Sequence, residues 1–352
     1  MYSSKLNNLS IGYIPYSKTL NAAGDRRRFV FYAKEAKLNF EIYSPNKKYD
    51  LVIATPQADP KLLLSLPKKT KLVFDFADAY MAESPFSIRG LLRGLFRFYK
   101  GSSSKFYLNY KNAFIDIMKR SCVVICSSPE QKKIILPFCK NVKVILDSHI
   151  NECYKVKKNF QVNKKLNIGW EGQHATIPSL LSLIKEISKT YLFEDINFHI
   201  VTDDNPRQLD KMLYGNSVKQ YLINRKYNIN FYPWSIENMN NLADLCDFAI
   251  IPVNLNNPMH LLKPENRLHL FWRLGLPVIA SSTEANVRAM KKCNIDLFAR
   301  SSMEFIKKIE LFRKSPEFVC ENSNLVLHYI NSNFTTDYFL ETWTKALICS
   351  FN

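Results

Sequence analysis

The chain has 352 residues, which is enough for two domains of ordinary size that each bury their own core. A hydrophobic content of 47% and a charged content of 23% fit a soluble globular protein. No apolar run approaches the roughly 18 residues that a membrane-spanning helix needs. The formal net charge of +18 favours nucleotide phosphates, nucleic acid or an anionic membrane surface as partners, although lysine on solvated surfaces accounts for part of it.

The N-terminus and the cysteines bear on the cellular compartment. The first residues lack a basic start followed by an apolar stretch, so we expect no secretory signal. The eight cysteines are scattered and form no CxxC pair, which favours reduced thiols over disulfides or zinc. We therefore expect a cytoplasmic protein.

Patterns typical of strands and helices alternate along the whole chain, which predicts βα units around parallel sheets. In the first half, strands are predicted at 9–14, 39–43, 50–54, 71–76, 121–127 and 142–146. Helices are predicted there at 21–36, 58–66, 87–99, 105–120 and 129–138. A polar, lysine-rich stretch at 151–165 has no clear period and is predicted to be a linker.

A second series of strands and helices follows this stretch. Its strands are predicted at 166–170, 196–202, 228–232, 247–251 and 276–280. Its helices are predicted at 176–189, 206–224, 236–243, 265–274, 284–292, 302–314, 317–331 and 335–349. The sequence thus predicts an α/β protein with two doubly wound, Rossmann-like domains, 1–150 and 151–334.

Basic residues lie at the start of the first predicted helix. Arg26 and Arg28 follow Gly24 there, and cations at a helix start favour a bound anion. A solvated surface explains these arginines equally well.

Two carboxylates and a histidine are candidates for acid–base chemistry. Asp75 and Asp78 follow the predicted strand at 71–76, and a carboxylate at such a place can act as a general base. Helix-cap or salt-bridge roles are the alternative. His149, near the end of the first half, is a further catalytic candidate.

The stretch 87–100 alternates bulky apolar residues with arginine at helical spacing. A cationic amphipathic helix of this kind can lie on an anionic membrane surface. The alternative is an ordinary helix that packs on the core and has a basic outer face. The membrane interpretation would place the protein peripherally on the inner face of the cell membrane.

The turn after the first strand of the second half contains Gly169, Glu171 and Gly172, and its glycines let a ligand approach the backbone. The turn lacks a GxGxxG fingerprint, which disfavours NAD-type binding. His174 and Asp203 also follow strands in this half. A surface histidine and a helix cap are the alternatives for these two residues.

A βαβ crossover begins after Trp234. Lys263, Asn266 and Arg267 open its helix, at the place where open α/β sheets bind ligands. Cations at this helix start suit a diphosphate. Trp234 follows a strand and can stack a nucleotide base, which is worth ~1–3 kcal/mol, or it can fill the core.

This crossover resembles the donor half of GT-B glycosyltransferases of the group 1, family 4-like type, two-domain enzymes that use nucleotide sugars. The resemblance rests on Trp234, on "ADLCDFAIIP", on the Lys-Pro-x-Asn-Arg helix start and on "GLPVIA". It implies donor contacts for the second-half candidates named above. It also implies that the basic residues after Gly24 face an acceptor cleft, and that 335–352 packs back on the first domain.

One departure from the family pattern concerns two glutamates. Many retaining GT-B enzymes carry them eight residues apart before "G-x-P-V", where this chain has Leu262 and Leu270. The glutamate that contacts the donor sugar is therefore missing, or Glu265 replaces it in a shifted register. The stereochemistry of transfer stays open.

The resemblance implies a hexosyltransferase that needs no metal and no cofactor. It would move a sugar from a nucleotide-sugar donor to a glycan or polyprenol-linked lipid acceptor in bacterial cell-envelope polysaccharide biosynthesis. A sugar-nucleotide epimerase or hydrolase on the same scaffold is disfavoured by the few acidic residues around the second-half motifs. A basic nucleic-acid-binding protein is disfavoured because no RNP motif, zinc finger or helix-turn-helix occurs.

Overall fold

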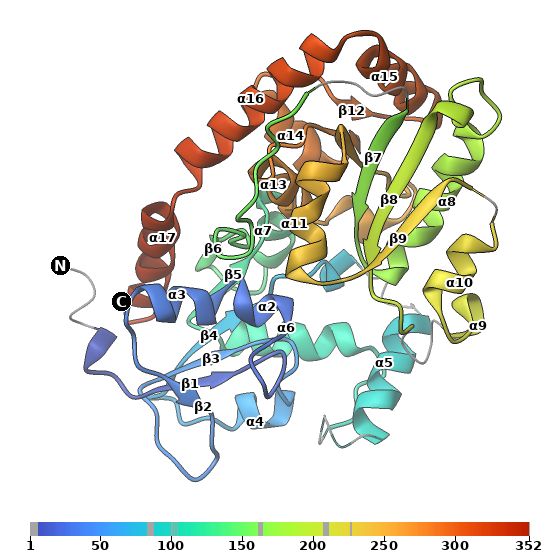
Figure 1. Ribbon diagram of the computed structural model, residues 1–352. Coiled ribbons are helices and arrows are strands. Elements are labelled where there is room, and N and C mark those ends of the chain that lie inside the picture. The colour runs from blue at the N-terminus through green and yellow to red at the C-terminus, as the bar shows by residue number, and fades with distance from the viewer. Residues whose placement is uncertain are drawn as a thin grey trace. The chain divides into compact units, whose positions relative to one another are not determined.

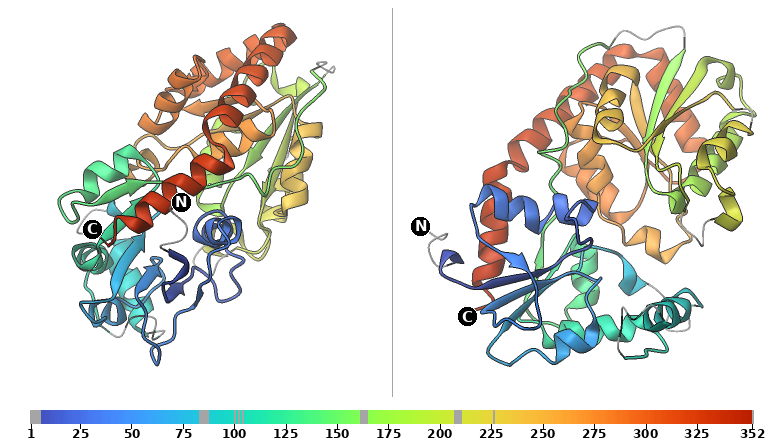
Figure 2. Two further views of the ribbon diagram at one scale, coloured as in Figure 1. Left: turned by 90° about the vertical axis from the view of Figure 1, so that its left-hand side faces the viewer. Right: turned by 60° about the horizontal axis from the view of Figure 1, so that its bottom comes forward.

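The computed structural model describes residues 6–82, 88–99, 101, 103, 105–160, 165–206, 211–225 and 227–351, apart from the side chains of 88–90 and 93. The chain divides into two units (Figure 1). The first unit comprises Met1–Ser148, Leu262–Pro264 and Thr336–Asn352, and the second comprises His149–Leu261 and Glu265–Thr335. Among the described residues, each unit has one six-stranded sheet with helices on both faces (Figure 2). The predicted α/β class with two Rossmann-like domains is confirmed.

The sheet of the first unit has the strand order β2-β1-β3-β4-β5-β6, and all its neighbouring strands are parallel. The strands are β1 (Ile11–Ile14), β2 (Glu41–Ile42), β3 (Leu51–Ala54), β4 (Lys71–Asp75), β5 (Val123–Cys126) and β6 (Val142–Val144). β3 and β5 are buried along their whole lengths, because helices cover both faces of a parallel sheet. The strand order reverses between β1 and β3.

Three of the described helices of the first unit begin at polar caps. They are α2 (Ala23–Arg26), α3 (Phe29–Glu35), α4 (Pro60–Leu64), α5 (Ile88–Tyr99), α6 (Tyr110–Arg120), α7 (Pro129–Ile135) and α17 (Thr336–Ile348). The side chains of Asp59, Asn109 and Ser128 accept hydrogen bonds from first-turn N–H groups of α4, α6 and α7.

Helix α17 packs against α3 through aromatic side chains. Trp343 has no solvent exposure, and its ring centroid lies 5.6 Å from that of Tyr32 and 5.9 Å from that of Phe29. The hydroxyls of Tyr32 and Thr344 are hydrogen-bonded at 2.9 Å. These contacts explain why the end of the chain belongs to the first unit.

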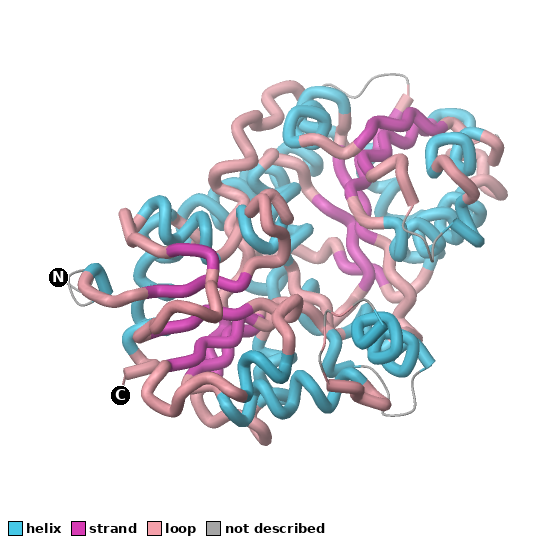
Figure 3. Tube along the Cα trace, turned by 90° about the horizontal axis from the view of Figure 1, so that it is seen from below, coloured by secondary structure: helices cyan, strands magenta, loops and turns pink. Residues whose placement is uncertain are grey.

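The sheet of the second unit has the order β12-β11-β10-β7-β8-β9, and its strands are also parallel (Figure 3). The strands are β7 (Leu166–Glu171), β8 (Ile196–Thr202), β9 (Ile229–Pro233), β10 (Phe248–Ile251), β11 (Val278–Ser281) and β12 (Phe298–Ala299). The strand order reverses between β7 and β10. The two-residue β12 was not predicted, because so short a strand has no readable period.

Most helices of the second unit follow the predicted series with small shifts at their ends, whereas α12 was not predicted. They are α8 (Ile177–Ile187), α9 (Lys211–Tyr214), α10 (Val218–Ile223), α11 (Ile236–Leu245), α12 (Pro258–Leu261), α13 (Asn266–Arg273), α14 (Glu284–Lys292), α15 (Ser302–Lys314) and α16 (Pro316–Asn333). The helical spacing of Leu268, Phe271 and Trp272 predicts a core-facing side, and all three are fully buried. No described helix is both long and apolar enough to cross a bilayer.

Two predicted helices are interrupted in the structure. The helix predicted at 21–36 breaks into α2 and α3, because the backbone of Arg28 leaves the helical region and its side chain turns into the core. The helix predicted at 206–224 contains α9 and α10, separated at Gly215 with φ +66° and restarted by the cap of Ser217. Residues 207–210 of that prediction lie outside the described residues.

Residues 149–160, here called the strap, are bound along the second unit and correct the linker predicted at 151–165. The side chain of Asn240 on α11 accepts hydrogen bonds from the N–H groups of Tyr154 at 2.8 Å and Lys155 at 3.0 Å. Its amide nitrogen donates to the carbonyl of Glu152 at 2.7 Å. The rest of the predicted linker includes 161–164, which lie outside the described residues.

The strap also follows the end of α13. The Lys157 N–H donates to the Leu274 carbonyl at 2.9 Å, and its ammonium donates to the Cys246 carbonyl at 2.8 Å. Gly275 adopts φ +69° beside it, where an added Cβ would lie 3.1 Å from Val156. The strap is therefore held by α11 and by the chain that ends α13.

Candidate functional site

The carboxyl edge of the second sheet holds the candidate site. Because the strand order reverses between β7 and β10, the loops that follow these strands diverge at this edge. Open α/β sheets bind ligands at such a switch point. Glu171 ends β7, and α13 begins after the loop that follows β10.

Glu171 joins Trp234 and Arg267. The indole Nε1 of Trp234, just after β9, donates to Oε1 of Glu171 at 3.0 Å. Nη1 of Arg267, in the first turn of α13, donates to the backbone carbonyl of Glu171 at 3.1 Å. All three residues are half-buried. One residue at the strand end thus holds an aromatic ring through its side chain and a cation through its backbone.

Arg267 retains most of its hydrogen-bonding capacity. Glu171 takes one of the five N–H donors of its guanidinium, and no other hydrogen bond joins that guanidinium to a residue that the structure describes. Burial lowers the pKa of Arg267 below its ordinary value, and Glu171 opposes that shift. The guanidinium still carries its charge at neutral pH. A cation with open donors at this edge suits an anionic ligand.

Gly169, which lies within β7 and not in the predicted turn, and Gly172, which follows the strand, both leave no room for a side chain. An added Cβ on Gly172 would lie 2.7 Å from the buried ring of Trp170 and 2.9 Å from Thr176 Oγ1. On Gly169 it would lie 3.1 Å from the Cys246 sulfur. The Thr202 hydroxyl donates to the Gly172 carbonyl at 2.7 Å and fixes the turn to β8.

His174 and Asp203 lie next to each other at the same edge. Nε2 of His174 and the backbone oxygen of Asp203 are 2.8 Å apart, and Tyr214 donates to the His174 carbonyl at 2.6 Å. The His174 side chain is buried, whereas Asp203 is exposed. The contact between His174 and Asp203 therefore connects the loops that follow β7 and β8.

The polar residues at and just before the start of α13 lie in different environments. Asn266 is the first residue of the helix and is half-buried. Lys263 is also half-buried and belongs to the segment Leu262–Pro264 of the first unit. Glu265 is buried, and its carboxylate accepts from Arg288 of α14 at 2.6 and 3.1 Å. The carboxylate of Glu265 is thus occupied by a structural ion pair.

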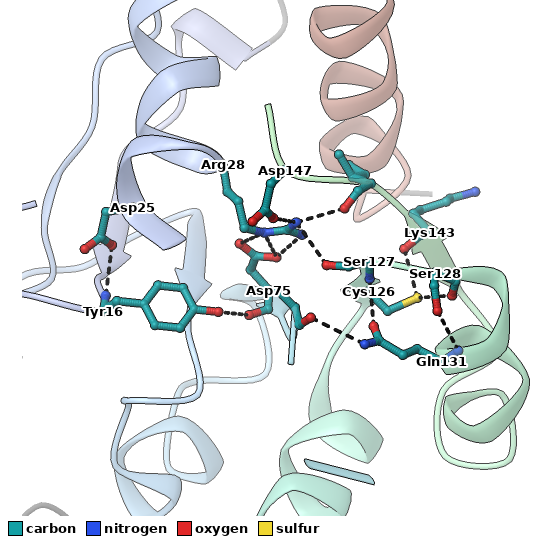
Figure 4. A network of polar contacts seen from close by, with 12 residues as sticks. Tyr16, Asp25, Arg28, Asp75, Cys126, Ser127, Ser128, Gln131, Lys143 and Asp147 are labelled. Carbon is teal, nitrogen blue, oxygen red and sulfur yellow. Dashed lines mark hydrogen bonds and ion pairs between the residues drawn. The ribbon is translucent and has the colours of Figure 1, made fainter. Parts of the chain in front are cut away.

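A buried ion network lies at the carboxyl edge of the first sheet (Figure 4). Arg28 donates to the Asp75 carboxylate through Nη2 at 2.6 Å and through Nε at 3.0 Å. Its Nη1 donates to Asp147 at 2.9 Å, to the Ile145 carbonyl at 2.8 Å and to Ser127 at 3.2 Å. One arginine therefore ties together the ends of β4, β5 and β6.

The surroundings keep Arg28 charged. Burial alone would lower its pKa, but Asp75 and Asp147 raise the pKa of Arg28 above its ordinary value. The guanidinium carbon also lies 5.9 Å from the ring centroid of Trp343. Arg28, predicted on an anion-binding helix start, instead has its guanidinium bound to two carboxylates, one carbonyl and one hydroxyl of the first unit.

Asp25 organises the loop after β1. Its carboxylate accepts from the Tyr13 hydroxyl at 2.7 Å, the Tyr16 N–H at 2.9 Å and the Ser17 N–H at 3.0 Å. The Tyr16 ring covers Gly24, where an added Cβ would lie 2.5 Å from a ring carbon. Gly24 is thus needed for packing in this loop.

The remaining first-half candidates have separate environments. Arg26 is half-buried and donates to the Asn21 carbonyl. Asp78 is half-buried, and its carboxylate accepts from the Ala79 N–H at 2.8 Å. His149 is 2% exposed, and its Nδ1 lies 3.8 Å from a carboxylate oxygen of Glu152 in the second unit.

The sequence interpretation missed Asp25, Asp147 and Ser127 as parts of these networks. Asp147 pairs with a residue 119 positions earlier, and Ser127 with one 99 positions earlier. The available signal was that Ser127 ends the strand predicted at 121–127 and Asp147 follows the one predicted at 142–146, whereas Asp25 lies inside a predicted helix and gave no such signal. No group of three or more His, Cys, Asp or Glu side chains that could hold a metal ion occurs among the described residues.

Comparison with solved structures shows which proteins share the fold of this chain. No protein-family profile and no curated protein matches the chain. A glycosyltransferase from Rickettsia africae ESF-5 superposes with a TM-score of 0.59 at 13% identity, over 97% of this chain and 98% of that one. WaaG, a glycosyltransferase involved in lipopolysaccharide biosynthesis, gives 0.56 at 11% identity, over 97% and 100%.

TarM gives a TM-score of 0.58 at 13% identity over 86% of this chain, which spans 55% of the length of TarM. TarM from S. aureus has also been solved with UDP and alpha-GlcNAc-glycerol. The chain has the fold of these GT-B glycosyltransferases, which confirms the GT-B fold that the resemblance in the sequence implied.

Proposed function

We propose that the chain is a glycosyltransferase that moves a sugar from a nucleotide-sugar donor to a glycan or lipid-linked acceptor in bacterial cell-envelope polysaccharide biosynthesis. The observation that carries the proposal is Arg267 at the switch point of the second sheet, beside Glu171 and Trp234. The GT-B fold supports it, as do the UDP and sugar bound in the TarM structure and the lipopolysaccharide role of WaaG.

Arg267 has the properties that a donor diphosphate needs. As the sugar bond breaks, negative charge builds on the leaving diphosphate, and a preorganised cation stabilises it. Arg267 is fixed by a backbone carbonyl and keeps open N–H donors. Lys263, four residues earlier in the chain, is proposed as a second cation, so that the reaction proceeds without a metal or cofactor.

Among the catalytic candidates, Asp78 is proposed as the general base for the acceptor hydroxyl. Its carboxylate is half-buried, and its hydrogen bond to its neighbour Ala79 leaves acceptor capacity. Asp75 is fully buried and bound to Arg28, so its proposed role is structural. The burial of His149 assigns it the same kind of role.

Titration calorimetry with UDP, GDP, ADP and TDP tests donor binding. Arg267→Ala should lower the affinity for the preferred nucleotide by about 10- to 150-fold, since a hydrogen bond to a charged group is worth about 1.5–3 kcal/mol. Arg225→Ala is the matched control, because it removes one exposed cation from the same unit. Transfer from the matching nucleotide sugar should fall in Arg267→Ala and Asp78→Asn.

Three results would contradict the proposal. The first is that none of the nucleotides binds. The second is that Arg267→Ala binds as the unmodified protein does. Donor consumption that is equally fast without any acceptor would favour a hydrolase or epimerase instead.

We further propose that α5 lets the protein contact an anionic membrane surface. Arg97 is buried, and it donates to the carbonyls of Pro56 and Gln57 at 2.7 Å and Ala58 at 3.3 Å. At Gly94 an added Cβ would lie 2.2 Å from the Tyr107 carbonyl, so this side of α5 faces the unit.

Among the described side chains of α5, the exposed ones are apolar instead. Leu92, Leu95, Phe96, Phe98 and Tyr99 are 46–91% exposed. Large exposed apolar groups on one helix suit a membrane surface. Ser87 and Lys100, at the ends of the predicted membrane segment, lie outside the described residues, as do the side chains of 88–90 and 93.

Cosedimentation with vesicles tests this contact. The protein should bind vesicles that contain phosphatidylglycerol more strongly than pure phosphatidylcholine vesicles. Phe96→Ser should weaken that binding several-fold, whereas Leu311→Ser, which changes an exposed leucine on α15, should not. Equal binding by both variants would refute membrane contact through α5.

A further inference from the structure

The carboxylates at the carboxyl edge of the second sheet differ in what they bind. Both carboxylate oxygens of Glu265 accept hydrogen bonds from Arg288. Asp204 accepts from the Ser217 hydroxyl at 2.8 Å and from the Lys219 N–H at 2.9 Å, at the start of α10. Glu171 differs from both, because its partners are residues of the candidate site.

Glu171 has one open carboxylate oxygen. Its Oε1 accepts from Trp234, and its backbone oxygen accepts from Arg267. Its Oε2 accepts no hydrogen bond from a residue that the structure describes. The residue is half-buried, so a ligand can reach this oxygen where water competes less.

The order of the three side chains matches the order of groups in a nucleotide. Trp234 is the aromatic group that can stack a base, and Arg267 is the cation that can hold a diphosphate. Glu171 contacts both of them. In a nucleoside diphosphate, the ribose is bonded to the base on one side and to the diphosphate on the other.

We propose that Oε2 of Glu171 accepts a hydrogen bond from a ribose hydroxyl of the nucleotide, so that Glu171 selects ribonucleotides over 2′-deoxyribonucleotides. This inference rests on the proposed function. A site with a placed acceptor rejects an analogue that lacks the hydroxyl, since the acceptor is then left without its partner. Glu171 thereby supplies a carboxylate at this site, although the chain has Leu262 and Leu270 at the positions of the family glutamates.

The test compares dissociation constants for UDP and 2′-deoxy-UDP, and for GDP and 2′-deoxy-GDP. The unmodified protein should bind the ribonucleotide about tenfold or more tightly, a preference of about 1.4 kcal/mol. Glu171→Leu should bring the ratio close to one. The variant keeps the backbone carbonyl that holds Arg267, so the diphosphate contact should survive.

Two further variants distinguish a loss of ribose selection from a loss of the structure of the site. Trp234→Phe loses the indole N–H but keeps Glu171, so overall affinity should fall while the ratio stays above fivefold. Glu171→Gln keeps the side-chain shape and should lower the ratio at least threefold, which provides the test if Glu171→Leu folds poorly. Melting temperatures without nucleotide report folding for each variant.

The failures are distinguishable. If the unmodified protein binds neither form of either nucleotide, the proposed function fails and this inference fails with it. If it binds the nucleotides and the ratio is close to one, or if the ratio is unchanged in both Glu171 variants, this inference alone is overturned.

Discussion

Arg28 and Asp75 form an ion pair in which neither side chain has any solvent exposure, with Nη2 and Oδ1 2.6 Å apart. The pair spans 47 positions of sequence and fixes the start of α3 to the end of β4. Removing one member of a buried pair leaves the other charge uncompensated, which is more damaging than removing both.

Asp75→Asn should therefore lower the free energy of unfolding by about 3–5 kcal/mol, measured by urea denaturation. The double variant Arg28→Met, Asp75→Leu should lose less than this. Asp78→Asn is the control, because Asp78 is half-buried and should change stability by less than about 1 kcal/mol. Equal losses in Asp75→Asn and Asp78→Asn would refute a structural role for the pair.

Asn240 should be essential for the strap, whereas its neighbour Asn241 should not. Asn240→Ala removes the acceptor of two strap N–H groups and the donor to a strap carbonyl, so we expect a loss of about 2–4 kcal/mol. Asn241→Ala removes one bond from the Lys155 ammonium and should change stability little. Hydrogen exchange of residues 152–157 provides the measurement, and unchanged protection in Asn240→Ala would contradict the expectation.

The buried histidines predict how stability depends on pH. Burial lowers the pKa of His269 well below its ordinary value, and His149, Arg273, Arg288 and Lys292 add to the shift. The folded state therefore binds fewer protons than the unfolded state just below about pH 6.5, the ordinary histidine value. Stability should be full above that pH and should decrease as the pH falls through it.

His269→Leu should flatten this pH dependence between about pH 5 and pH 6.5, measured by urea denaturation at each pH. The exposed His328 is the control, and His328→Gln should leave the slope unchanged. Burial also lowers the pKa of His199, so part of the slope should persist in His269→Leu. An unaltered slope in His269→Leu would refute the assignment.

Gly172→Ala should affect both stability and nucleotide binding. The added methyl group meets Trp170 and Thr176, and overpacking of this kind costs about 1–3 kcal/mol. Gly215→Ala is the control, since it has φ +66° but open space and should lose only about 1 kcal/mol through backbone strain. Nucleotide affinity should fall in the first variant and stay constant in the second.

Arg97→Met should loosen α5. The change leaves the carbonyls of Pro56, Gln57 and Ala58 without their donor, so we expect a loss of about 2–4 kcal/mol and faster hydrogen exchange of α5. Lys105→Met, at an exposed position, should change neither. Exchange of α5 at the original rate in Arg97→Met would show that Arg97 does not hold the helix.

The strands and most helices could be predicted because their signals are local. β3 is an apolar run between polar turns, and α13 shows the spacing of Leu268, Phe271 and Trp272. The helix break at Arg28 could not be predicted, since its cause lies at Asp75 and Asp147 far along the chain. For the same reason, sequence alone could not show that the guanidinium of Arg28 is occupied.

The amphipathic pattern of α5 indicated a helix but not which side faces the protein. Periodicity favours a core-facing apolar side, yet carbonyls of residues 56–58 bind Arg97, so the arginine faces inward. The pattern near Glu171 was similarly ambiguous. Its position after a strand marked a ligand site, but the bonds to Trp234 and Arg267 depend on how three strands align.

The chain passes directly from the first unit to the second between Ser148 and His149, the first residue of the strap. The Ser148 N–H is bonded to the Arg27 carbonyl of the first unit, while His149 already belongs to the second. A glycine-rich insertion between these two residues should leave each unit folded, because the hydrogen bonds of Ser148 and of the strap lie on either side of it.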